Sequence, residues 1–142
     1  MKNIQSTHAT FEQSKWLKEK GFDVKTRGRI HVSHWHLVKN NIIPSNVNTF
    51  HNDMFAPIDN WNKDNTHYMS LPEQWQVVEW LRINHGIWVS VTINGLNKTF
   101  NYDIHCINKQ QGSLDNIVIC GYETPQEAYS AAFDYILPTL IK

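Results

Sequence analysis

Cysteine is scarce in this chain, which holds only Cys106 and Cys120. They form no C-x-x-C pair, and 142 residues can bury a core without a disulfide, so we interpret both as buried free thiols. Long apolar runs are missing too, since none approaches the ~18 residues of a membrane-spanning helix. The residues that follow Met1 lack the apolar stretch of a signal peptide. The sequence therefore predicts a cytoplasmic protein with no membrane segment.

An excess of one charge is absent as well, because 13 Lys or Arg residues face 13 Asp or Glu residues. The halves differ, however. Residues 1–69 hold nine Lys or Arg against six Asp or Glu, a net charge of +3, whereas residues 70–142 hold four against seven, a net charge of −3. The whole chain gives no electrostatic case for nucleic acid. Any contact with nucleic acid is expected in the first half, at Lys15, Lys18, Lys25, Arg27 and Arg29.

The motifs of common enzymes are absent: the sequence has no Walker A loop, no G-x-G-x-x-G, no H-E-x-x-H and no paired C-x-x-C. Asp103 and His105 are expected to share one face of a sheet, with Ser90 opposite. No nucleophile elbow or oxyanion loop accompanies them. The simpler interpretation is the solvated side of a half-buried sheet. We predict that the protein is not an enzyme and uses no cofactor.

A group of histidines is the other candidate site. On a strand, His34 and His36 point to one face and His31 to the other. Two imidazoles at that spacing can share a zinc ion, with a third ligand from His51, Asp53 or His67. No known motif places that third ligand. We therefore predict no metal and interpret the histidines as part of a polar, partly exposed strand.

The first half predicts a helix and an irregular β region. A helix is expected from about Phe11 to Lys20, between a Thr10–Gln13 capping box and a terminating Gly21. The β-branched and aromatic content then favours a strand over Arg29–Val38, with Gly28 as the turn before it. A weaker strand over 47–55 and a long loop over 56–67 complete this half.

The second half predicts a helix, a three-stranded antiparallel meander and a helix. Ser70-Leu71-Pro72-Glu73 is typical of a helix start. This helix is expected to end at Gly86. The strands follow: alternating residues in Ile87–Ile93, a two-residue Asn94-Gly95 turn, and strands 100–106 and 117–122. The last helix is expected from a Thr124 cap with Pro125 to about Leu137, where Pro138 breaks or kinks it. The predicted fold class is α+β, in one domain over 1–142 with the helix and irregular β region over 1–69 and the α-β-β-β-α core over 70–142.

Aromatic residues are abundant, with six Trp, six Phe and five Tyr. Trp75 and Trp80 lie about 140° apart around their helix. That helix is therefore expected to be covered on two sides, by the meander and by either the N-terminal half or a partner. The final helix has a core stripe and a second small-residue patch at Ala128, Ala131 and Tyr135, which serves either packing or a homodimer. The candidate partner-binding residues are Trp35, Trp61, Trp75 and Trp88.

The helix–meander–helix order resembles the double-stranded RNA-binding domain. Thr124-Pro125-Gln126-Glu127-Ala128 and Ala131-Ala132 look like the start of the second helix of that family. The family places lysines there to grip phosphates, whereas this chain has Pro125 and Gln126 in a segment of net charge −3. Affinity for nucleic acid comes largely from Lys and Arg contacts to phosphates. The resemblance therefore supports the topology and argues against the function.

A second resemblance lies in the string Pro72-Glu73-Gln74-Trp75-Gln76-Val77-Val78-Glu79-Trp80-Leu81-Arg82-Ile83-Asn84-His85-Gly86-Ile87-Trp88-Val89. This string, together with Thr124–Leu137, resembles small uncharacterised proteins of phages and prophages of Bacteroidetes. The resemblance covers about half the chain and carries no functional residues. It implies a viral or mobile-element origin. Such accessory proteins often bind a host protein or ribonucleoprotein, including defence nucleases such as a CRISPR effector.

Overall fold

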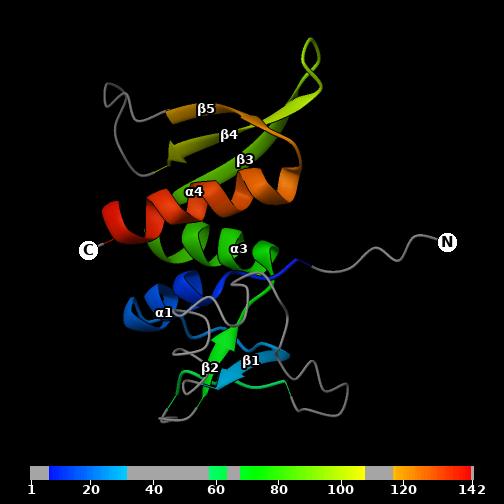
Figure 1. The fold of residues 1–142 in the computed structure, drawn as a ribbon. Helices are drawn as coiled ribbons and strands as arrows, with labels where there is room; N and C mark the ends of the chain where they lie inside the picture. The colour runs from blue at the N-terminus through cyan, green and yellow to red at the C-terminus, as the bar shows by residue number, and fades with distance from the viewer. Residues whose placement is uncertain (1–6, 32–57, 64–67, 108–116, 142) are drawn as a thin grey trace, which may run out of the picture. The chain divides into compact units, whose positions relative to one another are not determined.

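The computed structural model describes residues 7–31, 58–63, 68–107 and 117–141 (Figure 1). The chain divides into two compact units, Met1–Glu73 and Gln74–Lys142, hereafter unit 1 and unit 2. The α+β class predicted from the sequence is confirmed. That the whole chain forms one domain stays a prediction. Among the described residues, no helix has both the length and the apolar character that crossing a bilayer requires.

Unit 1 begins with helix α1 (Phe11–Glu19), and both ends of this helix form as the sequence predicted. The Gln13 backbone N–H donates to the Thr10 hydroxyl oxygen at 3.2 Å, and the Thr10 N–H donates to the Gln13 side chain at 3.0 Å. This reciprocal pair is the predicted capping box. After the helix, Gly21 takes a φ of +84°, which an L side chain rarely adopts. Buried Phe22 follows, so the predicted helix end is also confirmed.

Two short antiparallel strands, β1 (Gly28–His31) and β2 (Tyr68–Leu71), complete unit 1. Ile30, Met69 and Leu71 share one face of this sheet and form a buried cluster with Phe11. Gly28 lies inside the strand rather than in the expected turn, opposite Leu71. A Cβ at Gly28 would stand 2.7 Å from the Leu71 carbonyl oxygen, so the close pairing of the strands excludes a side chain.

Strand β2 corrects the predicted helix start at Ser70-Leu71-Pro72-Glu73. Ser70 and Leu71 belong to the strand, Pro72 accepts a hydrogen bond from the Ala9 N–H at 2.9 Å, and Glu73 bridges to His8. Residues 70–73 are therefore engaged in pairing with other segments, and the helix begins only at Gln74. The predicted strand residues 32–38 and 47–55 lie outside the described residues. Within the predicted loop, Asp59 pairs with Thr26 as an isolated bridge.

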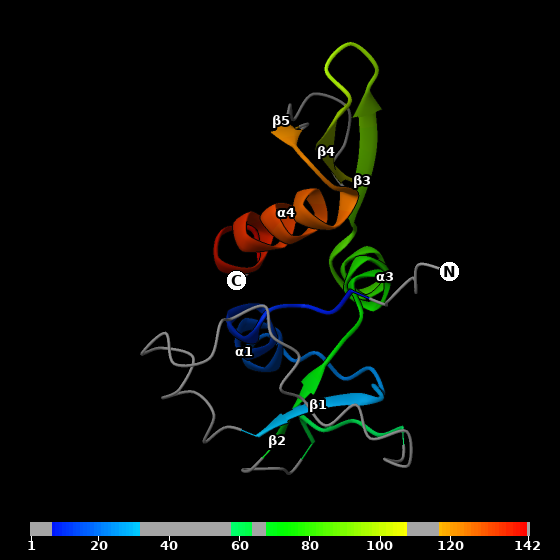
Figure 2. The same ribbon diagram turned by 45° about the vertical axis from the view of Figure 1, so that its right-hand side comes forward.

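Unit 2 has the predicted order of helix, meander and helix. Its elements are α3 (Gln74–His85), β3 (Ile87–Asn94), β4 (Thr99–Cys106), β5 (Ile117–Tyr122) and α4 (Pro125–Thr139). The strands form one antiparallel sheet in the order β3-β4-β5, with α4 packed along one face (Figures 1 and 2). Gly86, with a φ of +63°, ends α3 as predicted.

The turn between β3 and β4 differs from the expected two-residue Asn94-Gly95 turn. Asn94 pairs with Thr99, so the loop has four residues, Gly95 to Lys98. The Asn94 side-chain oxygen accepts the Leu96 N–H at 3.1 Å, and Lys98 takes the left-handed conformation with a φ of +53°. The asparagine therefore opens an Asx turn instead of occupying a left-handed position itself. The loop projects beyond α4 (Figure 2).

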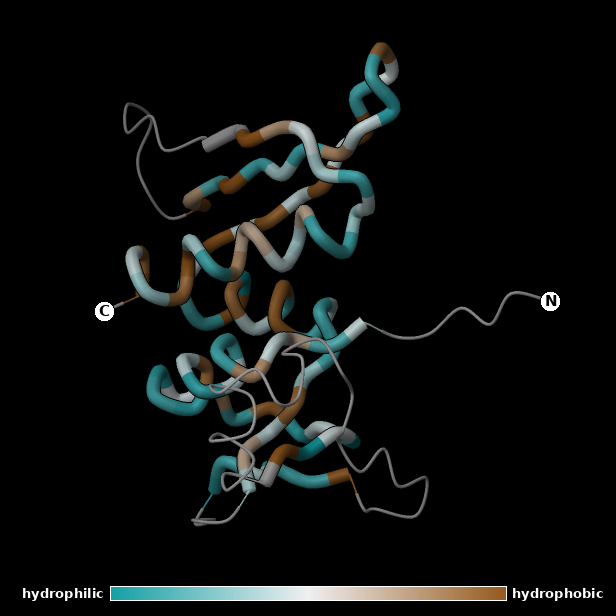
Figure 3. Tube along the Cα trace, viewed as in Figure 1, coloured by the Kyte–Doolittle hydropathy of each residue, from teal (hydrophilic) through white to brown (hydrophobic). Residues whose placement is uncertain are grey.

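Helix α4 contributes five buried residues to the core of unit 2. Thr124 caps it, since its hydroxyl oxygen accepts the Glu127 N–H at 3.2 Å, and Pro125 follows at the first helical position. The helix does not break at Pro138 but continues to Thr139, because a proline near the end interrupts few hydrogen bonds. Apolar residues recur along α4 and β3 (Figure 3). The fully buried residues of α4 are Ala128, Ala132, Phe133, Ile136 and Leu137, so Ala128 belongs to the core and not to a separate patch.

Candidate partner-binding surface

The tryptophans differ sharply in exposure. Trp75 on α3 is 61% exposed and Trp88 on β3 is 38% exposed, whereas Trp80 is 3% exposed. Trp61 is half-buried, and Trp35 lies outside the described residues. Of the candidate contact residues, the structure therefore places two indoles at the surface, both in unit 2.

Trp61 is engaged within unit 1. Its indole N–H donates to the Thr26 carbonyl oxygen at 3.1 Å. The guanidinium carbon of Arg29 lies 4.6 Å from the centre of the Trp61 ring and 4.5 Å from that of Tyr68. A guanidinium at this distance is attracted to the face of an aromatic ring. Trp61 thus ties residues 58–63 to strand β1, and a role for it in partner binding stays a prediction.

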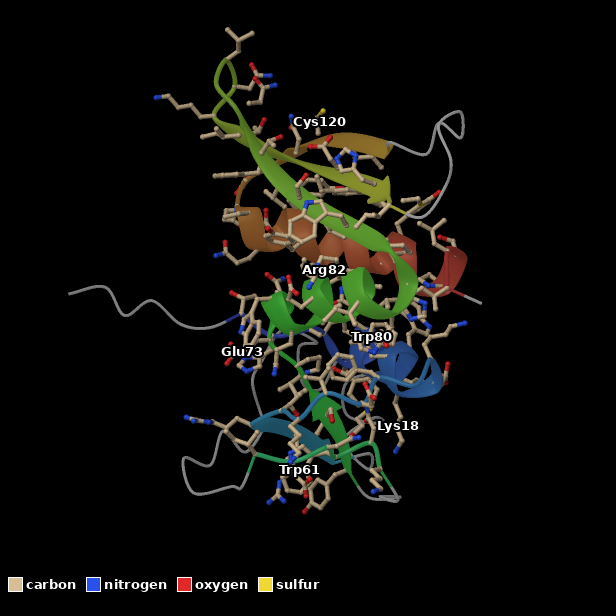
Figure 4. The ribbon with its side chains drawn as sticks, turned by 180° about the vertical axis from the view of Figure 1, so that it is seen from behind. Lys18, Trp61, Glu73, Trp80, Arg82 and Cys120 are labelled. Atoms are coloured by element: carbon tan, nitrogen blue, oxygen red, sulfur yellow. The ribbon has the colours of Figure 1, made fainter. Side chains whose placement is uncertain are left out.

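The outer face of α3 carries Trp75, Glu79, Arg82 and Ile83, which lie within an arc of about 100°. The opposite face is buried through Val77, Val78, Trp80 and Leu81. Arg82 donates two hydrogen bonds to one Glu79 carboxylate oxygen, at 2.8 and 3.1 Å, which raises the pKa of Arg82. In Figure 4, Arg82 and Trp80 leave the helix on different sides. The outer face therefore alternates apolar and charged groups in solvent.

The face of the sheet away from α4 forms the second surface. Cross-strand pairing sets Trp88 opposite His105, Ser90 opposite Asp103 and Thr92 opposite Asn101. Directly opposed residues of an antiparallel pair point to the same side. Ile87 and Val89, which alternate with these positions, are buried. We call this side of the sheet the open sheet face; of the six residues in these three pairs, Trp88 is the one large aromatic residue and the other five are polar.

Ser90, Asp103 and His105 share this face as predicted, but their setting is unlike that of a hydrolase. Ser90 lies in the middle of β3, not on a tight strand-to-helix turn. Asp103 and His105 are two residues apart on β4, which separates their backbones by about 7 Å. We therefore derive no catalytic step from these residues.

The two cysteines are free, but they are not both buried as the sequence suggested. Cys120 is exposed and Cys106 is half-buried. Cys120 pairs with Asn101 and therefore lies on the open sheet face. The sequence pattern of strand β5 did not show which of its faces α4 covers, which is why the interpretation failed for this residue.

The histidine group cannot be placed as a site. His34, His36, His51 and His67 lie outside the described residues, and His31 is described only in its backbone, at the end of β1. Within the described ranges, no group of three His, Cys, Asp or Glu residues is arranged to hold a metal ion. The absence of metal stays a prediction for the chain as a whole.

The basic residues of unit 1 are spread over several segments. Lys15 on α1 and Lys25 and Arg27 before β1 are exposed. Lys18 donates to the Tyr68 carbonyl oxygen at 3.4 Å, and Arg29 is held against Trp61 and Tyr68. Arg29 is therefore the least available of the five residues for a phosphate contact.

Sequence reasoning missed the exposed apolar residues near the end of the hairpin. Ile93 was expected on the buried face with Ile87 and Val89, but it is exposed, and Leu96 in the loop is 95% exposed. Alternation fixes which side of a strand a residue faces but not how far the covering helix extends. The signal in the sequence for this exposure was the position of Ile93, far from the start of β3 and close to the predicted turn.

The fold and these surfaces define an α+β protein with a helix–meander–helix unit and, in the part of the chain that the structure describes, two exposed indoles. The chain matches no protein-family model, no curated protein and no solved structure. The resemblance to the double-stranded RNA-binding domain stays a prediction from the order of the elements and from residues 124–132.

Proposed function

We propose that the protein is a small phage-type accessory module that binds a host protein or ribonucleoprotein in the host cytoplasm and modulates it. The observation that carries the proposal is the exposure of Trp75 and Trp88 while Trp80 is buried. Tryptophan is enriched among the residues that dominate binding energy at protein interfaces. Burying such a ring against a partner removes a large apolar area from water.

The distribution of exposed apolar side chains also favours a binding surface on unit 2. Eight large apolar side chains are exposed among the described residues, and all except Ile58 belong to unit 2. On the open sheet face, Trp88 is flanked by Ser90 and His105 rather than by further apolar residues. An aromatic anchor within a polar surround is the usual composition of a non-obligate protein interface.

The kind of partner follows from the resemblance of residues 72–89 and 124–137 to phage and prophage proteins. Accessory proteins of that origin often act on host machinery, and counter-defence inhibition of a nuclease such as a CRISPR effector is the specific form of the proposal. The proposal includes no catalysis, since Ser90 lies within strand β3 and not on a nucleophile elbow.

The test is capture of a partner from the lysate of a Bacteroidetes host by the purified chain. We expect a stoichiometric partner with the native chain and a loss of at least tenfold in affinity with Trp88→Ser, since a central aromatic anchor contributes roughly 2 kcal/mol or more. Ile58→Ser, at the exposed apolar residue of unit 1, is the matched control and should bind as the native chain does.

Circular dichroism should show that each variant keeps the native secondary structure. Failure to recover a partner from host lysates, or equal capture by Trp88→Ser and the native chain, would reject this surface. An inhibition assay on the captured host complex then separates modulation from simple binding.

A second candidate is contact with nucleic acid through unit 1. The observation that favours it is the exposure of Lys15, Lys25 and Arg27 in the half of the chain with net charge +3. Binding of this kind weakens steeply as salt rises, because each neutralised phosphate releases counterions. The double variant Lys25→Ala/Arg27→Ala should lower the salt dependence, and binding that ignores salt would reject this candidate.

A further inference from the structure

The open sheet face carries a carboxylate that has no partner among the described residues. Asp103 lies in the middle of β4 and is half-buried. Its carboxylate accepts no hydrogen bond from another described residue and forms no ion pair with one. A charged group that is partly withdrawn from water costs free energy unless a donor or a cation compensates it. The position of Asp103 therefore favours the approach of a group that donates hydrogen bonds.

The indole of Trp88 lies diagonally across the sheet from Asp103. Cross-strand pairing sets Trp88 opposite His105, and it sets Ser90 opposite Asp103. Trp88 and Asp103 are thus offset by two residues on neighbouring strands of one face, which places their Cβ atoms about 7 Å apart. Trp88 is 38% exposed, so part of its ring is open to solvent. An aromatic ring and a carboxylate therefore lie within the span of one long side chain.

The strands around these two groups supply no basic side chain. Strands β3, β4 and β5 contain neither Lys nor Arg. Residues 70–142 as a whole have a net charge of −3. A cation that approaches the face is therefore attracted by Asp103 and meets no lysine or arginine on the three strands, whereas an anion is repelled by the same carboxylate. The charge of the open sheet face thus selects a basic partner.

We propose that the open sheet face binds an arginine side chain from a basic segment of the partner protein. In this contact the guanidinium lies over the Trp88 indole and donates hydrogen bonds to the Asp103 carboxylate. A cation is attracted to the face of an indole, and a guanidinium can pair with a carboxylate through two parallel hydrogen bonds. Lysine fits less well, because its ammonium group is a point charge and not a plane that stacks on a ring.

Unit 1 contains a contact of the same kind within the chain. The guanidinium carbon of Arg29 lies 4.6 Å from the centre of the Trp61 ring. There, one chain provides both the arginine and the ring. On the open sheet face, the strands provide the ring of Trp88 and the carboxylate of Asp103 but no arginine. We assign the arginine of this second contact to the partner.

This inference rests on the proposed function, because it names the chemistry of the partner group that Trp88 contacts. The two can nevertheless fail separately, since binding of an arginine peptide is measured on the purified chain without any host component. If host lysates yield no partner but the peptide binds as expected, the proposed function fails and the arginine site stands. If a partner is captured through Trp88 but the peptide does not bind, the proposed function stands and this inference fails.

The experiment is an NMR titration of the full chain with a hexa-arginine peptide, with hexa-citrulline as its uncharged match. We expect the indole N–H signal of Trp88, assigned with Trp88→Phe, to shift and saturate with the arginine peptide and to stay in place with the citrulline peptide. Asp103→Asn should weaken binding about tenfold, because it removes the charge from a charge-assisted hydrogen bond. Asp134→Asn on α4 removes the same charge from the other side of the sheet and should bind as the native chain does.

Amide spectra of both variants, recorded before the titration, show whether each keeps the native fold. Equal affinities of Asp103→Asn and Asp134→Asn would overturn the proposal, because the peptide would then respond only to the net charge of the chain. A Trp88 signal that the arginine peptide does not move also overturns it. So does a native chain that self-associates in sedimentation and loses this association in Asp103→Asn, since a second copy would then occupy the face.

Discussion

The imidazole of His85 meets the indole of Trp80 edge to face, with the ring centroids 4.6 Å apart and the ring planes at 64°. The Nε2 atom of His85 is buried and has no hydrogen-bond partner among the described residues. Burial disfavours the charged imidazolium and lowers the pKa of His85 from its ordinary value of 6.5. The last turn of α3 thus ends on a histidine whose neutral form is favoured by the fold.

The first prediction concerns the dependence of stability on pH. Because the folded pKa of His85 is lower than 6.5, the unfolded state binds the proton more readily. The contribution of His85 to the free energy of unfolding is therefore fully present above pH 6.5, and it is lost as the pH falls from 6.5 through the lowered folded pKa. In thermal unfolding, the melting temperature should fall more steeply below pH 6.5 for the native chain than for His85→Gln. Parallel curves, or an imidazole that titrates at or above 6.5 by NMR, would contradict the argument.

The second prediction concerns Gly28. An alanine there would bring its Cβ to 2.7 Å from the Leu71 backbone oxygen, so the two strands would have to separate. We expect a loss of about 1–3 kcal/mol in the free energy of unfolding, measured by urea denaturation. Gly95→Ala is the matched control, since a Cβ at Gly95 would meet nothing within 4 Å and the φ of Gly95 is not positive. Equal stability of the two variants would show that the strands tolerate a Cβ at Gly28.

The third prediction concerns the rings around Arg29. Its guanidinium contacts both Trp61 and Tyr68, and each contact contributes about 0.5–1 kcal/mol. Arg29→Met keeps the aliphatic stem and removes the charge, so it should lower the free energy of unfolding by about 1–2 kcal/mol. Arg27→Met, at the exposed neighbouring position, should change it by less than about 0.5 kcal/mol. The change should also appear in the near-ultraviolet circular dichroism of Trp61.

The fourth prediction concerns the two thiols. Cys120 is exposed on the edge strand β5, whereas Cys106 is half-buried at the end of β4. A thiol reagent such as Ellman's reagent should therefore modify Cys120 faster in the native protein, because access limits the reaction. Cys120→Ser should remove the fast phase, and Cys106→Ser should leave it. A fast phase that survives Cys120→Ser would contradict the exposure assigned to β5.

Elements specified by nearby residues could be predicted from the sequence. The capping box joins Thr10 to Gln13, and Gly86 ends α3 one residue beyond its last turn, so a short window holds both partners. That Val89 and Ile104 lie on the same face of the sheet followed from alternation on the two strands of one hairpin, although the predicted turn gave a different register. In each case, the signal and the structure that it determines lie within a few residues or one turn.

Pairing between segments far apart in the sequence determined the features that the sequence did not predict. Ser70 carried a local signal for a helix start, but its backbone pairs with Arg29 on a distant strand, and this pairing prevailed. The exposure of surface residues likewise could not be predicted from neighbouring residues alone. The helical angle showed that Trp75 and Trp80 face different ways, yet only the position of the covering elements decides which of them is buried.

The loop from Gly95 to Lys98 has a practical consequence. It lies at the end of a hairpin, Leu96 is 95% exposed, and the space around Gly95 is open. Exposed loop tips accept inserted segments because no packed groups are displaced. A fluorophore or short peptide tag grafted there would report on host capture, while the exposed indoles of Trp75 and Trp88 stay native.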